Sequence, residues 1–155
     1  MVKEGQEPEG ATEALQQRFA DEILGTHAFR GDETVSVRPE KILEILQFLR
    51  DEPTLSFDFL TDLCGVHYPE KEHEFEVVYH LYSFPHNHRL RVKALLSGEG
   101  HITSVTSLYP GANWLEREAY DMVGIHFEGH PDLRRILMPD DFEGHPLRRD
   151  FPLTG

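Results

Sequence analysis

Residues 129–151 contain the same short motif twice, and this repeat limits what the C-terminal part of the chain can form. Gly-His-Pro at 129–131 and again at 144–146 is followed each time by a leucine and a pair of arginines. Proline disfavours a regular helix because it lacks an N–H and its ring clashes with the preceding turn. So many charges are also unsuited to a hydrophobic core. We therefore expect this segment to lie in an extended form on a folded surface, either of another protein or of its own domain.

The composition argues against several classes of function. A chain of 155 residues suits one domain, which removes roughly 70% of its extended-chain surface from water. The net charge of −13 argues against nucleic acid and anionic lipid as partners. A single cysteine, Cys64, excludes an internal disulfide and a cluster bound by several thiolates of this chain. Without a signal-like start or an apolar run of roughly 18 residues, we expect a soluble, cytoplasmic protein.

The N-terminal half is expected to contain two helices and a strand pair. Leucine, phenylalanine and isoleucine at four-residue spacing predict a helix that is capped by Thr12 and ends at Gly25. Two short strands, 28–30 and 34–37, are expected around a tight turn. A second helix begins near Pro39, with an apolar stripe that is typical of a core-facing helix.

The middle of the chain alternates between apolar and polar residues, as strands do. A strand-like run covers 55–68, and strict alternation covers 75–81 and 90–94, with a hairpin loop at 84–87 between them. A further short strand is expected at 102–108. The order of elements predicts a two-layer α+β fold, with one mixed or antiparallel sheet and helices on one face.

Three regions follow from these patterns. Residues 1–11 are expected to be a disordered acidic lead. Residues 12–128 are expected to form the α+β domain. Residues 129–155 are expected to form an extended, proline-rich docking arm.

A charged helix is expected just before the repeat. Asn113 suits its N-cap, Glu116 occupies the third helical position of a capping box, and Gly124 ends it. The helix also carries Arg117, Glu118 and Asp121. These charges suit either a solvated face with weak ion pairs or a docking surface for the basic groups of a partner.

A metal-dependent enzyme is an alternative of another class. His126 and His130 are four residues apart, with His145, Asp132, Asp140 and Asp141 nearby in the sequence. Imidazole and carboxylate groups hold hydrolytic zinc or non-haem iron. The surrounding glycines and proline argue against a helix that would bring the first two histidines together. The simpler interpretation is that His130 and His145 shape turns and bond to backbone carbonyls.

The arm combines arginines with apolar anchors, which is typical of protein–protein interfaces. It carries four arginines and five acidic residues, interleaved with isoleucine, leucine, methionine and phenylalanine. Disordered segments normally lack such anchors. We expect the arm to dock on another protein or subunit; packing back on its own domain is the alternative.

Residues 114–125, 129–137 and 144–153 closely resemble the signature of a known family. Their charges, glycines and prolines are similar to those of the C subunit (NuoC type) of respiratory complex I, the proton-pumping NADH:quinone oxidoreductase. Related subunits occur in membrane-bound hydrogenases and formate hydrogenlyases, and that alternative stays open. The match covers about forty residues.

The resemblance implies a non-catalytic scaffold of the peripheral arm of the complex. The chain would clasp the D subunit beside the B subunit, on the cytoplasmic side of the inner membrane, as part of an oxidoreductase and translocase. It would bind no cofactor itself, and flavin mononucleotide and iron–sulfur clusters would lie in partner subunits. The residues expected at the subunit interface are Glu116, Arg117, Glu118, Asp121, His130, Arg134, Arg135, His145, Arg148, Arg149 and Phe151.

Overall fold

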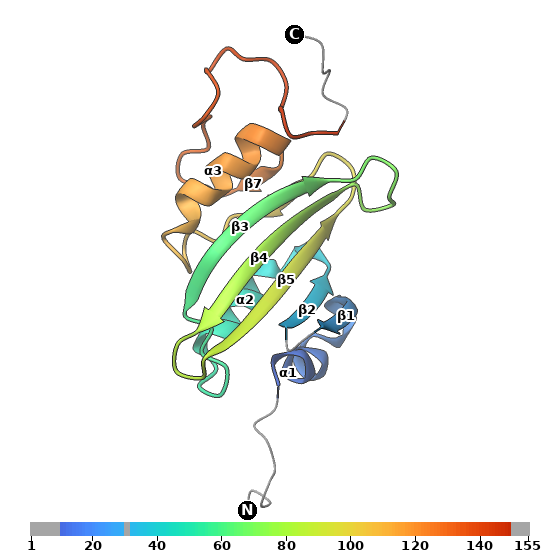
Figure 1. Cartoon of the computed structure of the whole chain (residues 1–155), viewed down its shortest axis with the longest axis vertical. Helices are drawn as coiled ribbons and strands as arrows, with labels where there is room; N and C mark the ends of the chain where they lie inside the picture. The colour runs from blue at the N-terminus through green and yellow to red at the C-terminus, as the bar shows by residue number, and fades with distance from the viewer. Residues whose placement is uncertain (1–9, 30–31, 150–155) are drawn as a thin grey trace, which may run out of the picture.

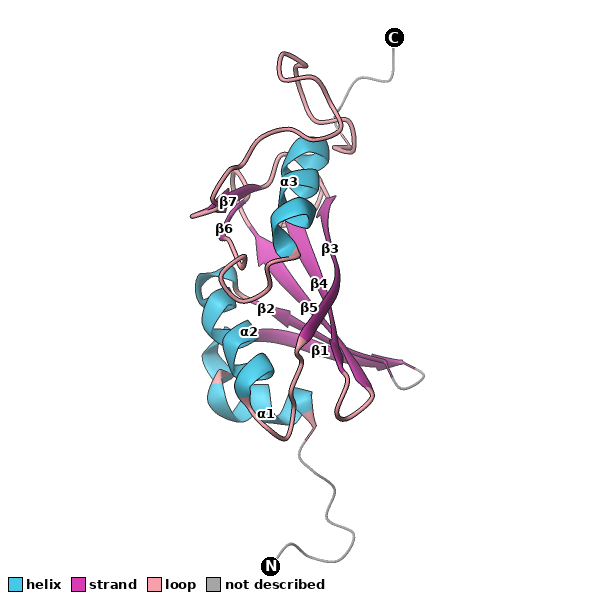
Figure 2. Ribbon diagram, turned by 90° about the vertical axis from the view of Figure 1, so that its left-hand side faces the viewer, coloured by secondary structure: helices cyan, strands magenta, loops and turns pink. Residues whose placement is uncertain are grey.

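In the computed structural model, which describes residues 10–29 and 32–149, three α-helices lie against one face of a five-stranded sheet (Figures 1 and 2). The helices are α1 (Ala11–Arg18), α2 (Ile42–Asp51) and α3 (Ala112–Val123). The sheet contains β1 (Ile23–Phe29), β2 (Asp32–Val37), β3 (Phe59–His67), β4 (Phe75–Ser83) and β5 (His88–Leu96). The predicted fold class, a two-layer α+β domain followed by an extended arm, is confirmed.

The strands follow the order β1-β2-β5-β4-β3. Neighbours pair antiparallel except β2 and β5, which run parallel with Val35 opposite Val92. Parallel neighbours need a long connection. Here that connection holds α2, β3 and β4, so the sheet is mixed.

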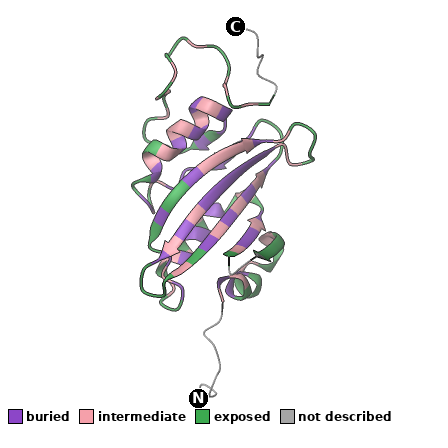
Figure 3. Ribbon diagram, in the orientation of Figure 1, coloured by how far each residue is buried: buried purple, intermediate pink, exposed green. Residues whose placement is uncertain are grey.

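The core lies between the sheet and the helices. Along β4 and β5, alternate residues such as Tyr79 and Val92 point inward and are fully buried. The predicted second helix is confirmed as α2, whose buried side chains are Ile42, Ile45, Leu46 and Leu49. The inward-facing residues of the strands and of α2 therefore pack into one hydrophobic layer; Figure 3 colours buried residues purple.

A short second sheet flanks α3. It consists of β6 (His101–Thr103) and β7 (His126–Glu128), which pair in parallel. The expected strand at 102–108 is wrong beyond Thr103. The chain turns away there because the N–H of Val105 bonds to the side chain of Glu116 instead of a neighbouring strand.

The first predicted helix was too long. Helix α1 ends at Arg18, and Gly25 lies within β1, paired with Ser36, because the ladder with β2 takes over that segment. The N-cap of α1 is Gly10 and not Thr12. The hydroxyl of Thr12 instead donates to Oε2 of Glu33 at 2.6 Å. Ala11, expected in the lead, begins the helix.

Candidate functional site

The two Gly-His-Pro turns hold opposite ends of the same helix. At the start of α3, Nδ1 of His130 accepts the N–H of Asp132, so Nε2 carries the proton and donates to the carbonyl of Asn113 at 3.0 Å. At the end of α3, Nδ1 of His145 bonds to the carbonyl of Asp121 at 2.9 Å. The interpretation that these histidines bond backbone carbonyls is confirmed. The repeat is thus a pair of clamps on α3.

The second clamp depends on the glycine that ends the helix. Gly124 adopts a φ of +87°, and a Cβ there would lie 2.7 Å from Cδ2 of His145. The ring of His145 therefore occupies the space that any other residue would fill. The predicted helix end at Gly124 is confirmed.

Asp121 binds the middle of the arm. Its Oδ2 accepts three consecutive backbone N–H groups, from Ile136, Leu137 and Met138, at 3.1, 2.7 and 2.9 Å. Its Oδ1 pairs with the guanidinium of Arg135 at 2.6 Å. The side chain is fully buried, so every bond is made without competing water.

These contacts set the charge state of Asp121. Burial by itself would raise the pKa of this carboxyl. The N–H of Met138, the guanidinium of Arg135 and the N–H groups of Leu137 and Ile136 outweigh burial and hold the pKa below its ordinary value. Asp121 is therefore an ionised anchor for the arm.

The end of the arm completes the helix terminus. The N–H of Leu147 bonds to the carbonyl of Met122, and the N–H of Arg149 bonds to Nδ1 of the buried His67. The last carbonyls of a helix have no partner within it. The arm supplies partners for those of Asp121 and Met122, so it acts as the C-terminal cap of α3.

Each arginine pair divides between the two sides of the arm. Arg135 faces inward to Asp121 and to the carbonyl of Gly144, while Arg134 is exposed and pairs with Asp132. In the second pair Arg148 lies over the ring of Phe75 at 4.9 Å, while Arg149 is exposed. Only one arginine of each pair is therefore presented outward.

Two residues expected at a partner interface are inside the protein. Glu116 and Asp121 are both 0% exposed, so neither carboxylate faces a partner, and that expectation is wrong. The predicted capping box is also wrong, because Asn113 lies inside α3, whose N-cap is Gly111, and Glu116 makes no capping bond. Glu116 accepts the hydroxyl of Ser104 at 2.7 Å and the N–H of Val105 at 2.8 Å, tying α3 to the chain after β6. Glu116 therefore stabilises the fold from inside the protein and is not part of a solvated helix face.

Of the other expected interface residues, Arg134 and Arg149 are exposed, whereas the side chain of His130 is 0% exposed. Arg117 is half-buried and donates to the carbonyls of Arg134 and Arg135, whereas Glu118 is half-buried on the same helix. Phe151 lies outside the described residues. The role of these residues in docking stays a prediction.

Large apolar side chains surround the clamps on the outside. Leu137, Leu147 and Trp114 are 56%, 62% and 53% exposed. The backbone N–H of Leu137 is bonded to Asp121, and that of Leu147 is bonded to the carbonyl of Met122. The backbone on which each exposed leucine stands is therefore fixed to α3. The polar groups of the arm thus face α3 while these apolar groups face outward.

The metal-site alternative does not assemble in the described residues. His126 lies on β7 with its ring 5.2 Å from that of His101, whereas His130 is bonded to α3. Among residues 10–29 and 32–149, no three histidine, cysteine, aspartate or glutamate side chains are placed to hold a metal ion. Histidines four residues apart are brought close together by that spacing only in a helix. Because His126 lies in strand β7, this spacing does not bring it to His130.

Two participants, Ser104 and His67, were not expected from the sequence. Ser104 lies in a loop that carries no motif, and its role depends on a carboxylate 12 residues further along. His67 ends β3, where its ring stacks on Phe75 at 4.7 Å and its Nδ1 receives a bond from a residue 82 positions away. A buried histidine at a strand end gives no signal of such a distant partner.

We expect Gly124→Ala to loosen the second clamp. A side chain at this φ costs about 1–2 kcal/mol, and the new Cβ displaces the ring of His145. Urea unfolding should show that loss, and trypsin should cut the arm faster. Gly111→Ala is the matched control, because Gly111 has a φ of −62° with open space around it. Equal losses in both variants would contradict this role of Gly124.

We expect the buried carboxyl of Glu116 to make stability depend on pH. Burial raises its pKa above the ordinary 4.5, against the bonds from Ser104 and Val105. The folded protein therefore holds this proton more tightly than the unfolded chain does. The wild-type free energy of unfolding, relative to Glu116→Gln, should fall as the pH rises above 4.5. Urea unfolding of both proteins at several pH values measures this difference; a rise would contradict it.

Sequence comparison relates the chain to one family. The family described as "Respiratory-chain NADH dehydrogenase, 30 Kd subunit" matches residues 35–155. The chain is 54% identical over 140 residues to the C subunit of the NADH-quinone oxidoreductase of Roseiflexus castenholzii (strain DSM 13941 / HLO8), covering 90% of this chain and 80% of that protein. It is 49% identical over 150 residues to the same subunit of Methylobacterium sp. (strain 4-46), covering 94% and 70%.

A solved structure is also similar. A chain of the membrane-bound sulfane sulfur reductase, an archaeal respiratory membrane complex, matches with a TM-score of 0.75 and 26% identity. The match covers 94% of this chain and 87% of that one. The likeness therefore extends over the domain and most of the arm.

Proposed function

The chain belongs to the family of the 30 Kd subunit of the respiratory-chain NADH dehydrogenase, and we propose that it is a non-catalytic scaffold there. The resemblance to the C-subunit family is thereby confirmed. The chain is a subunit of a membrane-associated, multi-subunit NADH–quinone oxidoreductase. No helix among the described residues has both the length and the apolar character needed to cross a membrane.

The clamped arm is the observation that carries this proposal. An arm fixed by both Gly-His-Pro turns and by Asp121 loses little conformational freedom when it binds, so less of the binding free energy is spent on ordering it. The exposed side chains of Leu137, Leu147 and Trp114 are then held in place to enter a partner's surface. The outward Arg134 and Arg149 add charged contacts at the edge.

The proposed partners are the D and B subunits, on the cytoplasmic side of the inner membrane. D would receive the arm, and B would lie beside it, so that the chain holds in place the subunits that pass electrons from iron–sulfur clusters to quinone. The chain itself would contribute binding and positioning, with the oxidoreductase and translocase activity belonging to the whole complex.

We propose that flavin and iron–sulfur clusters are held by those partners. An iron–sulfur cluster is held by several thiolates, and this sequence offers only Cys64. Cys64 lies half-buried on β3, where burial and the charge of Asp62 raise the pKa of its thiol. A thiol whose pKa is raised is a poor metal ligand, because the ligand is the thiolate.

The equivalent subunit of a related membrane-bound complex, of hydrogenase or formate hydrogenlyase type, is the second candidate. The similarity to a chain of the sulfane sulfur reductase shows that this fold also serves in another respiratory membrane complex. Identity of 54% to the Roseiflexus castenholzii protein, against 26% to the reductase chain, favours the NADH–quinone oxidoreductase.

Co-purification tests the docking arm. We expect the full chain to retain its D partner through affinity purification, and a chain without residues 129–155 to lose it at least tenfold. Because truncation also removes the partners of Asp121, a second variant, Leu137→Asp with Leu147→Asp, alters exposed side chains alone. It should also lose D while keeping the wild-type urea midpoint. Retention of D by both variants would contradict the proposal.

A further inference from the structure

The face of the sheet opposite the helices carries a column of basic side chains. The core residues Leu90 and Val92 of β5 point toward the helices. The alternate residues Arg89, Arg91 and Lys93, the basic column, therefore point to the opposite face. All three α-helices lie on the other side, so no described element covers this face (Figures 1 and 2).

The basic column has no ionic partner within the described residues. Arg91 donates to the hydroxyl of Thr34 at 3.1 Å, and no carboxylate lies within 4.0 Å of the charged nitrogens of Arg89, Arg91 or Lys93 in residues 10–29 and 32–149. Unpaired cations side by side repel one another, which a docked anion would relieve.

The neighbouring strand is affected by this positive charge. His80 on β4 lies opposite Arg91 and has Asp62 of β3 on its other side. Burial first, and then the charges of Arg91 and Lys93, lower the pKa of His80 despite Asp62. Burial and the two neighbouring cations therefore favour the neutral form of His80.

Aromatic side chains stand at one end of the basic column. Phe59 and Phe84 are 48% and 62% exposed, with ring centroids 5.6 Å apart, and Tyr82 meets Phe84 edge-on at 4.9 Å. Tyr82 in turn lies opposite Arg89 in the β4–β5 ladder. Exposed aromatic rings beside arginines are typical of the strongest contacts in protein interfaces.

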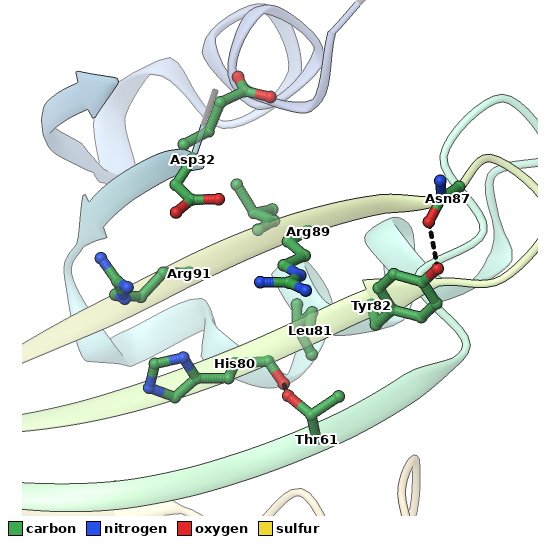
Figure 4. A pocket seen from close by; sticks show the side chains of 10 residues that line it. Asp32, Thr61, His80, Leu81, Tyr82, Asn87, Arg89 and Arg91 are labelled. Atoms are coloured by element: carbon green, nitrogen blue, oxygen red, sulfur yellow. Dashed lines mark hydrogen bonds between the residues drawn. The ribbon is translucent and has the colours of Figure 1, made fainter. Parts of the chain in front are cut away.

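A hollow of about 450 Å³ lies beside Arg89 and Arg91 of the column, and Tyr82 is the one of these three aromatic residues that lines it. Arg89 and Arg91 extend from β5 and His80 from β4 into this region, with Thr61 nearby on β3 (Figure 4). Two acidic residues also line the hollow: Glu33 is bonded to Thr12 and His88, and Asp32 extends toward the arginines from β2 (Figure 4). The hollow therefore combines the positive charge of Arg89 and Arg91 with these two carboxylates.

We propose that this face is a second docking surface, and that its occupant is an extended acidic segment of a neighbouring subunit. Alternate side chains of a strand are about 7 Å apart, so acidic residues at alternate positions of an extended segment match the column. An apolar residue of the segment would contact Phe59 and Phe84. A second copy of this chain fits poorly, because it would place one basic column against another.

This surface is distinct from the arm proposed to bind D. The arm lies on the helix layer and around α3 (Figure 2), whereas alternation along β5 directs the basic column to the opposite face of the sheet. Variants of one leave the other unchanged, so failure of either proposal is seen separately.

Zero-length cross-linking of the purified whole complex tests the proposal. A water-soluble carbodiimide joins an amine directly to a carboxylate that touches it. We expect mass spectrometry to find Lys93 joined to an aspartate or glutamate of another subunit. We also expect acetic anhydride to label Lys93 at least tenfold more slowly in the complex than in the isolated chain.

Charge reversal supplies the matched comparison. Arg89→Glu with Arg91→Glu should reduce the Lys93 cross-link at least tenfold, whereas Lys41→Glu with Lys71→Glu, both exposed elsewhere, should leave it unchanged. If the charge-reversed variant fails to assemble, the cross-link and the labelling rate of Lys93 in the wild-type complex still test the proposal. Cross-links of Lys93 only to Asp62, to residues 1–9 or to a second copy, or equal labelling in both states, would overturn the proposal.

Discussion

Replacing Asp121 by asparagine is expected to release the arm from α3. An amide has one acceptor oxygen, whereas Asp121 uses both oxygens for Arg135 and three backbone N–H groups. The NH2 group of the asparagine would face either the guanidinium of Arg135 or the backbone N–H groups, all of which are hydrogen-bond donors themselves. Removing one partner of a buried ion pair costs about 3–5 kcal/mol. Detachment of the arm, which lets Arg135 reach water, limits the loss to about 3 kcal/mol.

Trypsin measures this release because the arm contains four arginines. A loss of about 3 kcal/mol raises the population of the detached arm, and the rate of cleavage, roughly a hundredfold when opening is fast. The matched control is Glu118→Gln, a half-buried carboxylate on the same helix. It should change stability by less than about 0.5 kcal/mol. Equal cleavage of Asp121→Asn and wild type would show that the carboxylate does not hold the arm.

Replacing Glu116 by alanine is expected to destabilise the whole domain. The change leaves the N–H of Val105 and the hydroxyl of Ser104 without their acceptor and opens a cavity where a fully buried side chain stood. An unpaired buried group costs about 1–3 kcal/mol, and the cavity adds to it. We expect a loss of about 3 kcal/mol, and a melting temperature lower by about 6–12 °C.

Glu116→Gln separates hydrogen bonding from charge. Its amide oxygen can accept the N–H of Val105 while its NH2 group donates to Ser104, so we expect a loss of about 1 kcal/mol or less. Calorimetry and urea unfolding of both variants measure the difference. If glutamine were as harmful as alanine, the negative charge beside His130, 4.0 Å away, would be the stabilising feature instead.

Periodic patterns predicted the fold well. Alternation identified β4 and β5, and helical spacing identified α2, because in each case one face of the element packs against the hydrophobic core. The first helix failed where spacing of four residues carried on into β1. Pairing with β2 decided that segment, and strand pairing is a long-range interaction that local spacing does not encode.

The charges of α3 were the least predictable feature. Glu116 and Asp121 looked alike as acidic residues of a short polar helix, yet both are buried and bind different segments. The partners of the Asp121 carboxylate lie up to 17 residues further along the chain, and one partner of His67 lies 82 residues away. Which charge is buried depends on where the arm runs, and this is a property of the whole fold.

The sequence alone determined the fold class, the C-terminal end of α3, the doubled Gly-His-Pro turns, and the resemblance to the C-subunit family. These features rest on local chemistry: alternation, the proline ring, and a glycine where φ is positive. Only the tertiary structure decided that both turns clamp one helix and that two acidic side chains lie inside. It also decided that the basic column of β5 faces outward. The physical reason is that a carboxylate or guanidinium finds its partner through space, at distances along the chain that no motif records.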